Sequence, residues 1–231
     1  MKATSMFRIW LRARRTAVNL MMDCRGIAAT EFAVIVPVML VMFFGVVEIS
    51  SGIAVDRKVT LVARTLTDLT SQSPPDQQPP GNRNAATIGD VDLQNAFTAS
   101  AAILQPYLPT PEKATISEIY IDSAGKKATV TWSKAATFAA DGTATLTNSS
   151  HSPNDDVTAL AIFPASLLKA PSTYVILSEV SYLYTPAVGY VMGKAGVTLN
   201  DVAYTRPRQV QCVVYSGVPV VPAAPGLCPT P

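Results

Sequence analysis

The sequence has very little of the chemistry on which enzymes and metal sites depend. Among its 231 residues there is one histidine, His151, and there is no Cys-x-x-Cys pair. Neither a glycine-rich phosphate loop nor a dinucleotide-binding fingerprint occurs. A Ser/His/Asp set can be written within residues 149–156, but a catalytic triad needs groups that different elements hold in place. We therefore predict a protein that is not an enzyme and has no cofactor or metal, with a soluble hydrolase as the least favoured class.

Charged residues are also few, 15% of the chain, and they are unevenly placed. Residues 1–26 hold six basic residues and one acid, whereas residues 27–231 hold 12 basic and 15 acidic residues. No charge occurs from Phe32 to Val47, and the run over 27–55 exceeds the roughly 20 residues that cross a bilayer. A basic head beside an apolar span indicates a positive-inside membrane protein and not a nucleic-acid binder. We expect residues 1–26 to form a cytoplasmic leader and residues 27–55 a single transmembrane helix.

Two residues, Gly26 and Glu31, distinguish three interpretations of this span. A cleaved secretory signal has an apolar core of about 7–15 residues and a small-residue cleavage site, and neither is found here. A plain single-span anchor explains the length of the run. It explains neither the glycine nor a carboxylate near the front of an apolar helix, where a charge is costly. At about 1.5 Å per residue, Glu31 lies only about 7 Å beyond Gly26, which is a shallow position.

The third interpretation rests on residues 25–32, RGIAATEF, which follow the basic leader and begin the apolar run. This pattern resembles a class IV prepilin signal. The resemblance implies that a prepilin peptidase cuts between Gly26 and Ile27 on the cytoplasmic side of the membrane. The helix then stays in the mature protein, with Ile27 as its first residue and Glu31 as its fifth. A glycine suits such a site because it lets an extended chain enter the peptidase cleft.

Over residues 12–56 the sequence resembles, more narrowly, the TadE-like proteins of the tight-adherence (Tad/Flp) pilus system. The matching features are Ala29-Thr30-Glu31-Phe32, Pro37, Phe44-Gly45 and Glu48. The resemblance implies a pilin-like structural subunit, a minor pseudopilin, in the bacterial inner membrane. It also implies roles in pilus assembly and adherence. The implied partners are the membrane, the prepilin peptidase, other pilin-like subunits and the proteins of the pilus assembly platform.

The resemblance gives Glu31 a role in assembly. Its carboxylate can pair with the new α-amino group of Ile27 on a neighbouring helix, because buried charges are tolerated when they are paired. The alternatives are that the side chain of Glu31 reaches the lipid headgroups or is protonated.

Beyond the span, an apolar stripe predicts that the helix continues over residues 56–70. Its members are spaced four, three, four and three residues apart: Val55, Val59, Val62, Leu66 and Leu69. The stripe packs against the exported domain or, alternatively, forms a seam with a partner helix. Residues 71–90 contain the stretch SQSPPDQQPPGNRN, whose prolines exclude a helix, and are expected to be a linker.

Residues 91–231 are expected to form an exported, periplasmic α+β domain. The patterns predict a helix over 91–104 and a hairpin that joins 116–121 to 128–132, with Asp122 and Gly125 in its turn. Further strands are predicted at 174–184 and 197–204. We expect 141–156 to be a polar loop, 157–168 an apolar piece and the proline-rich tail from Gly217 to be irregular. A long N-terminal helix followed by an antiparallel sheet is a pilin-like α+β plan.

Two of the three cysteines, Cys212 and Cys228, fall in the exported part, where an oxidising compartment favours a disulfide. Such a bond would close a loop of about 15 residues and add about 3 kcal/mol of stability in the chain-entropy model. Two free thiols in the tail are the alternative.

For the whole chain, the alternative to a processed pilin-like subunit is an unprocessed single-span anchor that carries an extracytoplasmic binding module. In that case the leader stays attached and the function belongs to the exported domain.

Overall fold

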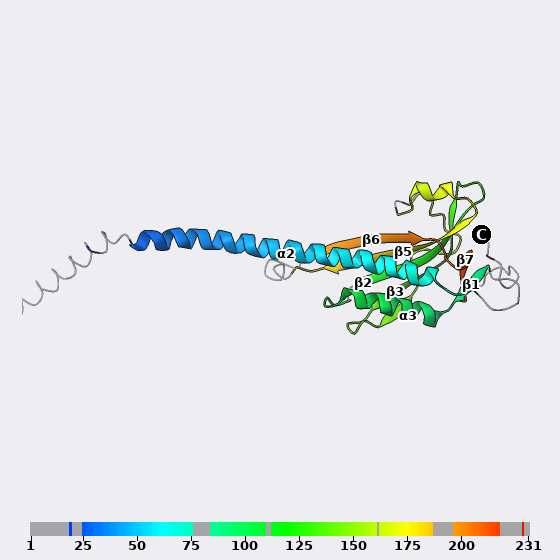
Figure 1. Cartoon of the computed structure of the whole chain (residues 1–231), viewed down its shortest axis with the longest axis horizontal. Coiled ribbons are helices and arrows are strands. Elements are labelled where there is room, and N and C mark those ends of the chain that lie inside the picture. The colour runs from blue at the N-terminus through cyan, green and yellow to red at the C-terminus, as the bar shows by residue number, and fades with distance from the viewer. Residues whose placement is uncertain are drawn as a thin grey trace, which may run out of the picture. The chain divides into compact units, whose positions relative to one another are not determined.

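The computed structural model describes residues 19, 25–75, 84–109, 112–160, 162–186, 196–217 and 228. The chain divides into two compact units, Met1–Ser50 and Ser51–Pro231, and each is described by itself (Figure 1). Most of the predicted leader, residues 76–83 of the predicted linker and nearly all of the tail after Gly217 lie outside the described residues.

One helix, α2 (Arg25–Ser71), begins in the first unit and ends in the second. Among the described residues of the first unit, no apolar side chain of α2 belongs to a hydrophobic core. Thirteen large apolar residues from Phe32 to Ile49 are exposed, and each has between 46% and 72% of its surface accessible to solvent. An 18-residue window of this helix has a mean hydropathy of 2.6 and none of it is buried, so length and composition suit a membrane span.

In the second unit α2 buries one stripe of side chains. Val55, Val59, Val62, Ala63 and Leu66 are each fully buried and belong to the main hydrophobic core. The prediction that this stripe packs against the domain that follows it is therefore confirmed. The prediction is wrong for the last residue of the stripe, because Leu69 is 40% exposed.

Local hydrogen bonds and prolines end α2 at Ser71. The Gln72 N–H donates to the carbonyl of Asp68. The Ser71 and Ser73 hydroxyls donate to carbonyls three residues earlier. Pro74 follows, and the residue before a proline is disfavoured in a helix.

The sheet of the second unit has five antiparallel strands in the order β4-β3-β2-β5-β6. The strands are β2 (Glu112–Ile121), β3 (Ala128–Phe138), β4 (Ala144–Thr147), β5 (Thr173–Tyr184) and β6 (Val197–Thr205). A separate pair, β1 (Ala85–Ile88) and β7 (Cys212–Tyr215), is parallel. The helical elements are α3 (Asp90–Ala101) and the 3-10 turns η1 (Ala102–Leu104) and η2 (Ala165–Lys169).

The predicted α+β plan is confirmed, as are the helix near 91–104, the hairpin and the strands near 174–184 and 197–204. The hairpin turn forms as the sequence predicts. Asp122 accepts hydrogen bonds from the Lys126 and Lys127 N–H groups. Gly125 has φ +64°, and a Cβ there would lie 2.6 Å from the Leu168 carbonyl oxygen, so a glycine is required.

Three short strands lie where the sequence predicts none. The stretch 141–156 was predicted to be a polar loop, but it contains β4. Residues 71–90 were predicted to be a linker, but they contain β1 at their C-terminal end. The third, β7, lies between the predicted strand 197–204 and the tail, where no element was predicted. All three strands have four residues, too short for a clear alternation of apolar and polar side chains. The apolar piece 157–168 forms no strand, and η2 begins near its end.

The sheet has a hydrophobic cluster on each face. On one face α2 and α3 cover residues that include Trp132, Ile116 and Ile176 (Figure 1). On the other face Ile119, Ile121 and Val130 pack with Phe163. A β-bulge makes this possible, because Trp132 pairs with Glu118 whereas Val130 pairs with Ile119. The extra residue, Thr131, places neighbouring apolar residues of β3 on opposite faces.

Polar contacts also hold α2 to the rest of the second unit. The Lys58 ammonium donates to the carbonyls of Ile103 (2.8 Å) and Gln105 (2.6 Å), just where η1 ends. The Ser178 hydroxyl of β5 donates to the Ala63 carbonyl (2.6 Å), and Thr60 donates to the Asp201 carboxylate of β6. The second half of the helix is therefore part of the folded domain.

We predict that Leu66→Ala destabilises the second unit by about 2–5 kcal/mol, because it leaves a cavity between α2 and the sheet. Leu61→Ala is the matched control, since Leu61 lies on the same helix and is 50% exposed. Urea unfolding of the full chain in detergent micelles, followed by intrinsic fluorescence, measures both. Equal losses in the two variants would contradict the packing described here.

Candidate functional site

The predicted cleavage residue Gly26 lies in the first turn of α2 and is exposed. A Cβ built at Gly26 would meet nothing within 4 Å. Glycine costs about 1 kcal/mol relative to alanine inside a helix, so neither packing nor helix propensity accounts for it. The first N–H groups of a helix have no partner within the helix, so this turn opens at little cost. A reason for Gly26 must therefore be sought in something that binds the chain here.

Glu31 and Phe32 follow in the next turn of α2, and both are exposed. The uncharged run from Phe32 to Val47 separates Glu31 from Glu48 by about 25 Å along the helix. That length is close to the roughly 30 Å thickness of a bilayer hydrocarbon core. The two carboxylates therefore stand near the two ends of the segment that can span a membrane.

The other predicted helix features, Pro37 and Gly45, are set into this apolar segment. Pro37 lies inside α2 and has no N–H to donate, so one helical hydrogen bond is missing. Gly45 has open space around it, because a Cβ there would meet nothing within 4 Å. As at Gly26, the single chain gives no packing reason for the glycine.

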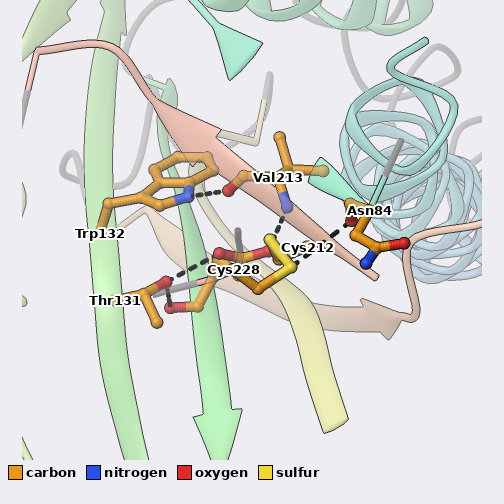
Figure 2. The surroundings of a disulfide bond; sticks show 7 residues. Asn84, Thr131, Trp132, Cys212, Val213 and Cys228 are labelled. Atoms are coloured by element: carbon orange, nitrogen blue, oxygen red, sulfur yellow. Dashed lines mark hydrogen bonds between the residues drawn. A yellow bond between two sulfur atoms is a disulfide. The ribbon is translucent and has the colours of Figure 1, made fainter. Parts of the chain in front are cut away.

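The predicted disulfide residues lie at the opposite end of the chain. Cys212 and Cys228 are joined by a disulfide with a Cα–Cα distance of 5.7 Å (Figure 2). Cys212 is the first residue of β7 and is fully buried. The Cys228 sulfur also lies 3.4 Å from the Asn84 carbonyl oxygen, next to β1. The bond thus fastens Cys228 to the β1-β7 pair.

A buried carboxyl group that sequence reasoning missed holds β7 to the large sheet. Glu118 is fully buried, and its Oε1 accepts the Val213 N–H at 2.5 Å. On the same residue of β7, the Val213 carbonyl accepts the Trp132 ring N–H, as Figure 2 shows. Both backbone groups of Val213 are thereby bound by side chains of the sheet. We call Glu118, Trp132 and Val213 the β7 clamp.

Burial raises the pKa of Glu118 from its ordinary 4.5 to about 8, although bonds from Val213 and Thr131 oppose the shift. The Thr131 hydroxyl oxygen lies 3.0 Å from the Glu118 carbonyl oxygen and 2.9 Å from its Oε2. A hydroxyl has one proton to donate and can also accept. When Glu118 is protonated, each of these groups therefore has a partner. The carboxyl O–H of Glu118 donates to the Thr131 hydroxyl oxygen, and the Thr131 hydroxyl donates to the Glu118 backbone carbonyl.

A second buried acid, Glu112 at the start of β2, differs from Glu118 because neither of its carboxyl oxygens has a hydrogen-bond partner among the residues that the structure describes. Burial raises its pKa to about 8. A neutral carboxyl group is favoured here as well, because an unpaired buried charge is far more costly.

The Ser/His/Asp set around His151 is not brought together. The His151 ring nitrogen Nε2 lies 2.8 Å from Oε2 of Glu179 on β5. Asp155 accepts the Ser152 N–H and Asp156 accepts the Thr158 N–H, so both acids stabilise the loop backbone.

Comparison with known proteins finds a family match for the apolar part of α2 and the stripe that follows it. Residues 26–66 match the family model described as TadE-like protein. This region of the chain is TadE-like. The match begins at Gly26 and runs through Glu31, Pro37, Gly45 and Glu48 into the buried stripe of α2. Searches of curated proteins and of solved structures found no match.

We predict that the second unit loses stability as the pH rises. The folded-state pKa values of Glu112 and Glu118 lie above the ordinary 4.5, so their contribution is full below about pH 4.5 and is lost as the pH passes about 8. Thermal unfolding should therefore have a midpoint several degrees lower at about pH 8.5 than at about pH 5.

Glu118→Gln should weaken this pH dependence, because an amide can donate to Thr131 and accept from Val213 without ionising. Its midpoint should match the wild type near pH 5 and exceed it near pH 8.5. Asp56→Asn, at an exposed carboxylate of α2, is the control and should leave the dependence unchanged. A Glu118→Gln variant with the wild-type pH dependence would contradict the clamp as described.

Proposed function

We propose that this chain is a minor pseudopilin of a Tad/Flp-type pilus, a pilin-like structural subunit and not an enzyme. The TadE-like region and the exposed apolar helix support a Tad-pilus-related, membrane-anchored protein. We further propose that the chain is a single-pass protein of the bacterial inner membrane. Residues 1–26 lie in the cytoplasm and the second unit in the periplasm, in keeping with the basic residues that precede the span.

The observation that carries the proposal is Gly26. It opens the TadE-like match, it stands in a helix that gains nothing from a glycine, and it is exposed. Cleavage by a prepilin peptidase would hydrolyse the Gly26–Ile27 bond. The carboxylate of Gly26 would leave with the leader, and the mature chain would begin with the α-amino group of Ile27.

The new amine gives Glu31 a partner. The Glu31 side chain is exposed on an apolar helix, where an unpaired charge is costly in a membrane. Pairing with the Ile27 amine of a neighbouring pilin-like subunit removes that cost and sets the register between two helices. The exposed apolar side chains around Glu31 then pack with other helices, and platform proteins of the assembly machinery hold them together.

The test is the mature N-terminus, determined by mass spectrometry of the protein from its native membrane. We predict that the wild-type chain begins at Ile27 and that Gly26→Ala keeps the leader. Gly45→Ala is the matched control, because Gly45 is also a helical glycine with open space around it, but lies 19 residues further along. It should be processed like the wild type.

A leader retained by all three proteins would contradict the proposal. The chain would then be an unprocessed single-span anchor that carries an extracytoplasmic binding module.

A further inference from the structure

The second unit contains a cleft of about 570 Å³ between α2 and β6. From α2 it is lined by residues between Arg64 and Leu69, and from β6 by Val202–Thr205, with Arg208 at one end. Its volume lies within the range of ordinary ligand sites, about 300–1,000 Å³. Thr60 and Asp201 join the helix to the strand beside it, so its two walls are held together.

The cleft follows the edge of β6. Successive side chains of a strand point to opposite faces, so four consecutive residues can line one cavity only if it runs along the edge of the strand. β6 is the last strand of the sheet, and within the described residues no strand pairs with its outer edge. An edge strand directs backbone N–H and C=O groups outward, and these can pair with another extended chain. The Val202 N–H donates to the Asp201 carboxylate at 2.7 Å, so the groups of β6 proposed for pairing are those from Ala203 to Thr205.

The cleft also offers one free positive charge. Arg208 forms an ion pair with Asp68. Arg64 is exposed, and among the described residues no carboxylate forms an ion pair with it. A guanidinium binds a carboxylate through two parallel hydrogen bonds. The hydroxyl groups of Thr65, Tyr204 and Thr205 supply further hydrogen-bonding groups around it.

We propose that this cleft binds an extended peptide segment that carries a carboxylate. The segment pairs with the outer edge of β6 as a sixth antiparallel or parallel strand, and its carboxylate binds Arg64. Strand addition between an edge strand and a helix is a recurring mode of peptide recognition, in which backbone pairing supplies affinity and nearby side chains supply specificity. A small anion fits less well. It would bind only the guanidinium of Arg64, the one unpaired cation among the described residues of the cleft, and would leave the backbone groups along the edge of β6 unpaired.

The proposal can be tested with three biotinylated heptapeptide pools of otherwise random sequence and the full chain in detergent micelles. One pool has an internal glutamate and a C-terminal amide. The second has a free C-terminal carboxylate and no acidic side chain, and the third has neither. We expect the chain to bind one of the first two pools at least fivefold more than the third. The pool that binds shows whether a side chain or a C-terminus supplies the carboxylate.

Arg64→Gln should lower this binding about tenfold. Arg57→Gln should leave it unchanged, since Arg57 is an exposed arginine of the same helix that does not line the cleft. Methylation of alternate peptide nitrogens should abolish binding, because strand pairing needs those N–H groups. The proposal is overturned if the three pools bind equally or not at all, if Arg64→Gln has no effect, or if methylated peptides bind as well as unmethylated ones.

Discussion

The structure depends on one constraint: the 47 residues of α2 must suit two different surroundings. Among the described residues of the first unit, the large apolar side chains from Phe32 to Ile49 are exposed, except that of Val36, which is partly buried, and lipid or other apolar helices can cover them. In the second unit a single stripe is fully buried, and most residues on the other faces are polar, with Ile53, Leu61 and Leu69 as exposed apolar exceptions. An unbroken helix meets both demands, because it satisfies its own backbone hydrogen bonds wherever it lies. The proposed membrane role and the exported core thus share one element.

Different interactions hold β7, the last strand of the fold, in place. β7 is only four residues long, and two β-strands alone are marginally stable in water. The β7 clamp and the disulfide to Cys228 compensate for this shortness. A neutral buried carboxyl group can bind backbone and hydroxyl groups at once without the cost of a buried charge. The clamp thus explains why an acid lies within β2, on the face that also carries the buried residues Ala114 and Ile116.

The sequence allowed the long helix, the hairpin and two long strands to be predicted, because each has a run of residues long enough to show a period. The positions of β1, β4 and β7 could not be predicted, since four residues show no period, and β1 and β7 pair with each other across more than a hundred residues. Glu118 was missed for a related reason. Its burial follows from the bulge at Thr131 and from Val213, 95 residues away. The cleft beside β6 likewise exists only once α2 has packed on the sheet.

The measurement that tests the account most directly is treatment of native membranes with the apolar reagent dicyclohexylcarbodiimide. The reagent activates a carboxylate, and an amine in contact with it displaces the urea and forms an amide bond. The account predicts a cross-linked product in which the Ile27 nitrogen of one mature subunit is joined to Glu31 of another. The product should be absent from Gly26→Ala and Glu31→Gln variants. Full-length monomers with no such amide would contradict it.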